Sequence, residues 1–169
     1  EPLSTLQSLW PKYLDVFGRF GAHIRGEFPQ IQAELLAAAG ILTWQGGPIE
    51  EFLATDQAGK LPDCLSQFNY VDWLAQTYTE AGIHVTREVR GLRMPTLVPP
   101  GLLVALIVLE AKLVRASGVN SINVAYAPCG HLLQDVAALT VLADIAHDDL
   151  PATVVCLPWS GGSLLGVRS

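Results

Sequence analysis

Short apolar runs and longer segments of helical periodicity alternate along the chain. The runs are rich in apolar and β-branched residues, which predicts short β-strands at 21–24, 41–44, 82–86, 121–126 and 152–157. Between them, apolar residues recur at three- and four-residue steps, and this spacing predicts helices over 29–39, 65–81, 101–116 and 131–146. A further helical element is expected in the N-terminal stretch 2–20.

Prolines and glycines mark where the helices begin and end. Pro99 and Pro100 precede the helix over 101–116 and Gly118 follows it, while Gly40 and Gly82 close the two helices before it. A strand–helix alternation repeated roughly every 35 residues is typical of βα units around a parallel sheet. The expected fold class is therefore α/β, with about five strands and four helices in one domain over residues 1–169.

The composition agrees with a buried sheet and restricts the possible partners. Apolar residues make up 50% of the chain and charged residues 15%, as expected when strands are covered on both faces. The net charge of −6 argues against binding to nucleic acid or to an anionic membrane surface. The apolar run Leu102–Leu109 is too short to span a bilayer.

Cysteine usage and the first residue bear on location and completeness. The chain has an odd number of cysteines, Cys64, Cys129 and Cys156, and their spacing is not that of zinc ligands. This pattern indicates reduced thiols in a cytoplasm. Cys129, in a turn before a helix, is interpreted as a small buried hydrophobe rather than an activated thiol. The chain opens with Glu1 rather than Met, which indicates processing or a piece of a longer protein.

Binding sites in parallel α/β proteins form where strands end and loops to the next helix begin. Arg25 and Arg87 each follow a predicted strand, where a guanidinium either binds a carboxylate ligand or pairs with the neighbouring Glu27 or Glu88. The four histidines are scattered and show no spacing typical of metal ligands, so no metal site is expected.

The stretch "WQGGPIEE" (44–51) raises a separate question, because two glycines directly follow an apolar run. Gly46 and Gly47 are either ordinary turn residues or leave room for a flat ligand against the backbone. Glu50 and Glu51 are either acid–base groups or the solvated start of a helix.

Four ordered stretches resemble one family. "LTWQGGPI" (42–49), "GIHVTREVRG" (82–91), "TLVPP" (96–100) and "NVAYAPCGHLLQDVAAL" (123–139) are similar to the E (ε, large) subunit of methylaspartate mutase, also called glutamate mutase. A weaker likeness extends to "HIRGEFPQ" (23–30) and "WSGG" (159–162).

The resemblance implies a fold, a reaction and a cofactor. The family fold is a TIM-type (β/α)8 barrel, of which this chain would supply about five strands, so the barrel is incomplete. A longer chain or a second copy would complete it, or the sheet is open. The implied reaction rearranges (S)-glutamate to 3-methylaspartate and depends on adenosylcobalamin, held at the interface with a small cobalamin-binding subunit.

The resemblance also assigns residues to the substrate. Arg25 aligns with an arginine that holds a substrate carboxylate, and Gly26 lies where the family has histidine. Gln45 falls where the family has a glutamate facing the substrate ammonium. Glu51 and Thr55 lie at positions where the family has two tyrosines that contact the substrate. The side chains expected to face the substrate therefore differ from those of the family.

The cofactor side is assigned in the same way. Ala54 aligns with a family proline that lies beside the cofactor, and Arg90 aligns with a family phenylalanine. Gly46 and Gly47 would let the cofactor approach the backbone. The leading hypothesis is a cobalamin-dependent isomerase acting on glutamate or a related amino acid; the alternative is a non-catalytic homologue that serves as a binding or assembly partner. A weaker third hypothesis is an unrelated α/β enzyme that binds a small acidic metabolite.

Overall fold

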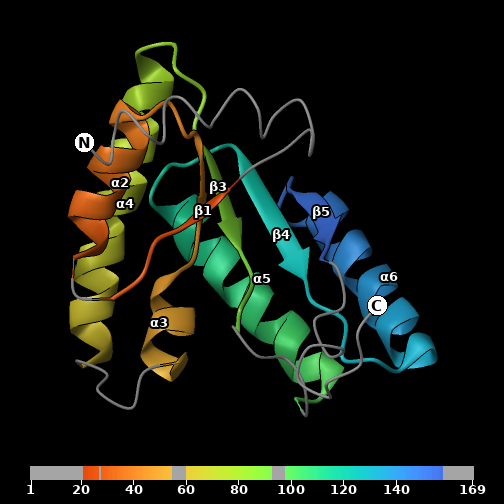
Figure 1. Cartoon of the computed structure of the whole chain (residues 1–169). Helices are drawn as coiled ribbons and strands as arrows, with labels where there is room; N and C mark the ends of the chain where they lie inside the picture. Colours follow the sequence, from red (N-terminus) through yellow and green to blue (C-terminus); the bar gives the residue numbers. More distant parts are fainter. Residues whose placement is uncertain (1–20, 27, 55–59, 93–97, 158–169) are drawn as a thin grey trace, which may run out of the picture.

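The computed structural model describes residues 21–26, 28–54, 60–92 and 98–157, which form a five-stranded parallel sheet with helices packed against it (Figure 1). The predicted N-terminal helix, Thr55 and the "WSGG" stretch lie outside the described residues. None of the described helices is long and apolar enough to cross a membrane.

The strands lie side by side in chain order. Their bounds are β1 Ala22–His23, β2 Thr43–Gln45, β3 Thr86–Val89, β4 Ile122–Tyr126 and β5 Thr153–Cys156. Each neighbouring pair is parallel, and the sheet order is β1-β2-β3-β4-β5. The described strands thus make an open sheet with β1 and β5 at its edges, an arrangement consistent with part of a barrel.

Helices fill the connections between the strands. They are α2 Pro29–Ala38, α3 Pro48–Ala54, α4 Leu61–Glu80, α5 Pro100–Ala116 and α6 Leu132–Asp148. The four predicted helices correspond to α2, α4, α5 and α6. The short helix α3 is an addition, since its seven residues give too few turns for a recognisable apolar period.

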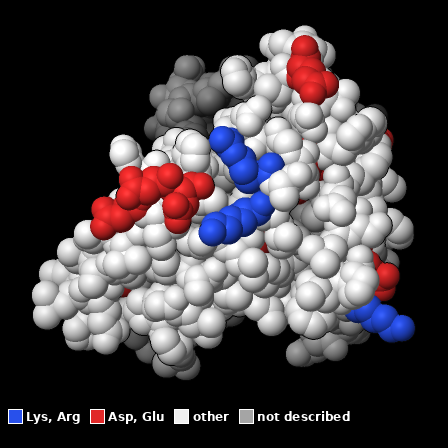
Figure 2. Space-filling model, turned by 180° about the vertical axis from the view of Figure 1, so that it is seen from behind, with Lys and Arg blue, Asp and Glu red and all other residues white. Residues whose placement is uncertain are grey.

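The helices gather on one face of the sheet. Parallel crossover connections are right-handed, and a strand order that never reverses places all of them on the same side. In Figure 1, α5 and α6 lie behind the strands. Figure 2 shows this helical side, where a few basic and acidic side chains lie among mostly uncharged ones. No described helix covers the opposite face of the sheet.

The core lies between the sheet and these helices. Trp44, Val89 and Val124 of the strands are fully buried, together with Phe68 of α4 and Ile107 of α5. This layer explains the high apolar content, because both the inner helix faces and the strands contribute to it.

Arg87 corrects one expectation from the sequence. It lies inside β3 rather than after a strand, and its side chain is fully buried on the helical face. Its Nε donates to Asp72 Oδ1 of α4 at 2.6 Å, and its terminal nitrogens donate to the backbone oxygens of Trp44 and Gly46 at 2.8 and 2.9 Å. Asp72 is thus its ion-pair partner, in place of the expected Glu27 or Glu88, and Arg87 fixes the end of β2.

Candidate functional site

A row of polar side chains runs across all five described strands. The register pairs His23 with Gln45, Gln45 with Glu88, Glu88 with Asn123, and Asn123 with Thr153. We call these five residues the polar row. Side chains of successive strand residues point to opposite faces, and Arg87 points to the helices. The polar row therefore lies on the face that no described helix covers.

Glu88 is the centre of the polar row. One of its carboxylate oxygens accepts a hydrogen bond from Gln45 Nε2 at 2.8 Å, and the other from Asn123 Nδ2 at 3.5 Å. Glu88 and Asn123 are each 3% exposed. Burying a carboxylate is costly unless it is hydrogen-bonded, so the two amides from the neighbouring strands stabilise it there.

A second cluster lies where β1 and β3 end. Glu50 of α3 is fully buried, and its Oε1 is 3.0 Å from His23 Nε2 and 3.4 Å from a terminal nitrogen of Arg90. The other ring nitrogen of His23 lies 3.1 Å from the backbone oxygen of Ile24. Glu50 thus joins the first and third strand ends through one carboxylate oxygen.

The two glycines of "WQGGPIEE" are needed because protein atoms approach them closely. Gly46 has φ +106°, and a Cβ there would lie 2.6 Å from the backbone oxygen of Ile24. A Cβ on Gly47 would lie 2.3 Å from Oε1 of Glu110 in α5. The space that side chains would take is thus filled by Ile24 and Glu110, and the approach of a cofactor to this turn stays a prediction.

Glu110 connects two of the loops at this edge. Its Oε1 accepts hydrogen bonds from the backbone N–H groups of Ile49 and Glu50 at 2.9 and 2.8 Å, and its Oε2 accepts one from Gly91 at 3.3 Å. Burial raises the pKa of the Glu110 carboxyl to about 7, and the nearby Glu50 charge adds to the rise. The three N–H donors oppose this shift without cancelling it.

The structure places both glutamates of the turn inside the protein. Glu51 is 6% exposed, and its Oε1 accepts a hydrogen bond from the Gly26 backbone N–H at 3.0 Å. Both residues lie in the first turn of α3, as expected for a helix start, but the expected solvation is wrong. Glu51 instead holds the loop after β1 against α3.

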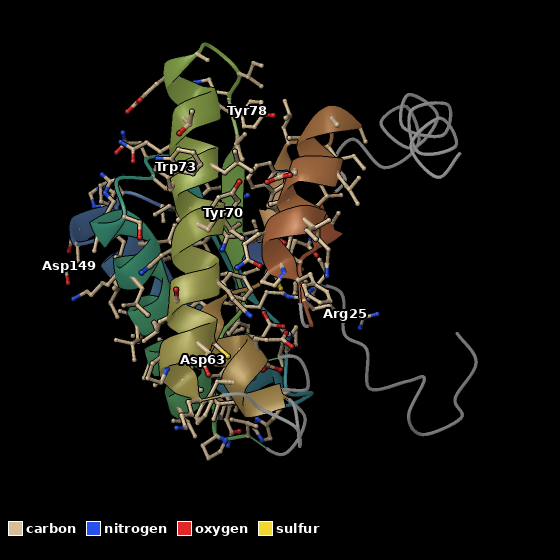
Figure 3. The ribbon with its side chains drawn as sticks, turned by 90° about the vertical axis from the view of Figure 1, so that its left-hand side faces the viewer. Arg25, Asp63, Tyr70, Trp73, Tyr78 and Asp149 are labelled. Carbon is tan, nitrogen blue, oxygen red and sulfur yellow. The ribbon has the colours of Figure 1, made fainter. Side chains whose placement is uncertain are left out.

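Arg25 differs from the other predicted site residues in its exposure. Its side chain is exposed, and Figure 3 shows it pointing away from the helices into solvent. Among the described residues, only its backbone is held, through contacts with the side chain of Gln32. On the same view, Tyr70 of α4 lies toward α2, where its hydroxyl donates to Glu34 at 2.6 Å.

The loop after β4 is organised by Asp135. This carboxylate accepts hydrogen bonds from the Tyr126 hydroxyl and from the backbone N–H groups of Cys129 and Gly130, at 2.8 to 3.1 Å. Burial raises the pKa of the Cys129 thiol, and its hydrogen bond to Asp135 raises it further, so the thiol is not activated. Cys129 is half-buried rather than a core residue, because it lies in the loop.

The predicted site residues separate into three groups. Gln45, Gly46, Gly47, Glu51 and Arg90 come together at the carboxyl edge of the sheet, with Gly26 beside Glu51. Arg25 projects away, Ala54 ends α3, and Thr55 lies outside the described residues. Sequence reasoning missed the roles of His23, Glu88, Asn123 and Glu110; the recurring polar residue within each apolar run was the available signal.

The described residues do not gather a metal-ligand set, since no group of three His, Cys, Asp or Glu side chains among them could hold an ion. A cobalamin carried by another subunit would need from this chain a polar surface rather than metal ligands. In the described part of the chain, the Arg90 Nε at the carboxyl edge has no hydrogen-bond partner, so it is a donor that a bound group could use.

Comparisons with known proteins agree with this arrangement of motifs. Residues 23–159 match the family described as methylaspartate mutase E chain. The glutamate mutase epsilon subunit of Halobacterium salinarum is 35% identical over 156 residues, covering 88% of this chain and 33% of that protein. Those of Treponema denticola and Escherichia coli O157:H7 are 35% and 32% identical over 141 residues, covering 79% of this chain and 29% of each relative. The matched region thus spans at most a third of the length of these relatives.

Proposed function

The chain belongs to the methylaspartate mutase E chain family, and on that premise we propose that it forms part of the barrel subunit of a cobalamin-dependent carbon-skeleton isomerase. The substrate is glutamate or a related amino acid. The observation that carries the proposal is the polar row, which gathers hydrogen-bonding groups of all five described strands on one face. Its members His23 and Gln45 end their strands, where parallel α/β proteins bind ligands.

The residues take the roles that the family resemblance suggests. Arg25 and Gln45, with Gly26, Glu51 and Thr55 nearby in sequence, bind the substrate. Gly46, Gly47, Ala54 and Arg90 lie on the cofactor side. Bound adenosylcobalamin would supply the radical chemistry, while this chain orients the substrate and excludes water.

The proposal includes the rest of the assembly. The described sheet is an arc of a (β/α)8 barrel, completed by a longer chain or by a second copy, because parallel sheets are stable when their edges are paired. The partner is a small cobalamin-binding subunit docked at the carboxyl edge. The three free thiols support a cytoplasmic location.

One observation favours a second candidate, a non-catalytic homologue that serves as an assembly partner. Glu51 already accepts the Gly26 N–H, and Gln45 already donates to Glu88. Two side chains expected to face substrate are thus occupied by contacts inside the protein.

Turnover distinguishes the two candidates. The full-length natural protein, the small subunit and adenosylcobalamin are incubated with carbon-13-labelled (S)-glutamate, and 3-methylaspartate is measured by NMR. The isomerase predicts product, and Arg25→Gln should lower kcat/KM about tenfold or more by removing a charged hydrogen bond, whereas Arg115→Gln on the helical face should not. Absence of product from a well-formed complex, with glutamate and with related amino acids alike, would support the assembly partner.

A further inference from the structure

Arg90 is a partly buried cation that uses few of its hydrogen-bond donors. It follows β3 directly, and its side chain is one-fifth exposed, at 20%. A guanidinium carries five N–H donors. Among the described residues, Arg90 makes a single long contact, 3.4 Å to Glu50, and its Nε is buried there without an acceptor. A donor set so incompletely used is costly to keep buried.

Arg87 provides an internal comparison, because it belongs to the same strand. Its guanidinium makes three hydrogen bonds of 2.6 to 2.9 Å, to a carboxylate and two backbone oxygens. It also lies over the ring of Phe68, at 5.8 Å from the ring centroid. Arg87 therefore uses each of its three nitrogens in a short hydrogen bond, and Arg90 does not follow that pattern.

The position of Arg90 directs it toward a ligand. Residues alternate between the two faces along β3, so Arg90 follows Glu88 on the side of the polar row. Its contact with Glu50, which also contacts His23, agrees with that placement. The guanidinium thus lies at the strand ends, beside the turn that contains Gly46 and Gly47.

We propose that Arg90 is a carboxylate-binding residue of the site, receiving one carboxylate of a small organic acid on its unused donors. A planar fork of N–H groups matches a carboxylate bidentately, and such charge-assisted bonds are among the strongest hydrogen bonds in proteins. Glu50 holds the arginine at the strand end. His23 contacts the same carboxylate oxygen of Glu50 from the other side, so Glu50 is held in place by two residues.

This inference rests on the proposed function only for the identity of the ligand. If the proposed function holds, the ligand is an amino acid with a second carboxylate. It gives Arg90 a role different from the cofactor contact that the resemblance suggests. The test uses the chain without cobalamin or a partner subunit, so its failure is distinct from failure of the mutase proposal.

The experiment follows the Arg90 Nε–H signal in nitrogen-15 NMR spectra of the full chain during titration with glutarate, its neutral diamide, or inorganic phosphate. The signal is assigned by its loss in Arg90→Lys and Arg90→Gln. We expect a saturable shift with glutarate and none with the diamide. Arg90→Gln should weaken glutarate binding about tenfold or more, while Arg90→Lys, which keeps the charge and loses the fork, should weaken it less.

Arg115→Gln, on α5, is the matched control and should bind glutarate like the unmodified chain. An Arg90 signal that does not move with glutarate would overturn the proposal, as would unchanged affinity in Arg90→Gln. A shift with phosphate and none with glutarate would also overturn it, because the site would then be selective for a phosphate group.

Discussion

Replacing Glu110 by glutamine should change how stability depends on pH. Glutamine has the same shape and keeps an oxygen for the N–H groups of Ile49 and Glu50. Its amide nitrogen faces the Gly91 N–H, so a donor meets a donor. The variant therefore removes the charge and separates the loop after β3 from the turn after β2, without leaving a cavity.

The magnitude follows from the pKa of the Glu110 carboxyl, which burial raises from 4.5 to about 7. Between pH 4.5 and about 7 the folded state binds more protons than the unfolded state, so the free energy of unfolding falls as the pH rises. The contribution of this group to stability is fully present below pH 4.5. It is lost as the pH rises to about 7. A shift of this size corresponds to about 3 kcal/mol. Glutamine does not titrate, so the variant should gain about 3 kcal/mol relative to the unmodified chain over this interval.

The assay is urea unfolding of both proteins at a series of pH values, with the exposed Glu80→Gln as a control for a change of charge. The difference in the free energy of unfolding between the Glu110 variant and the unmodified chain is plotted against pH. A difference that stays constant within about 0.5 kcal/mol would refute the reasoning, because Glu110 would then titrate alike in the folded and unfolded states.

Two further substitutions test the packing at this edge by chemical unfolding. Gly47→Ala should destabilise the fold by about 1–3 kcal/mol, because its Cβ would lie 2.3 Å from the Glu110 carboxylate. The control is Gly101→Ala, which should be neutral or stabilising because a Cβ there would have no atom within 4 Å. Arg87→Gln should cost about 3–5 kcal/mol, since it leaves Asp72 buried without its cation. Equal costs for the two glycine variants, or a loss at Arg87 under about 1 kcal/mol, would contradict the packing described.

Hydrophobic periodicity was sufficient to predict the order of strands and helices. Four predicted strands matched because each was a separate apolar run, and each long helix carried several turns of apolar period. The third strand was predicted over 82–86, but β3 is Thr86–Val89, because its charged residues Arg87 and Glu88 interrupt any apolar run. Gly40, Gly82 and Gly118 lie two residues beyond the ends of α2, α4 and α5, as their positions suggested. The helix α3 was missed because seven residues do not establish a period.

The site could be predicted only in part. Gln45 and Arg90 were candidates because of their places in the motifs, and their roles stay predictions. The polar row depends on register, which relates residues far apart in sequence. Glu110 is fully buried, although it follows the apolar residues of α5 and is close in sequence to Lys112. A buried carboxylate is recognisable only once its donors from other elements are known.

The central claim is that the carboxyl edge of this sheet docks a cobalamin-carrying subunit. The direct measurement is size-exclusion chromatography with light scattering and corrin absorbance, on the chain with a cobalamin-loaded small subunit. We predict a complex that carries the corrin absorbance and weakens in Arg25→Glu, in the exposed loop after β1, but not in Arg115→Glu on the helical face. A folded chain that elutes apart from the corrin absorbance would contradict the claim.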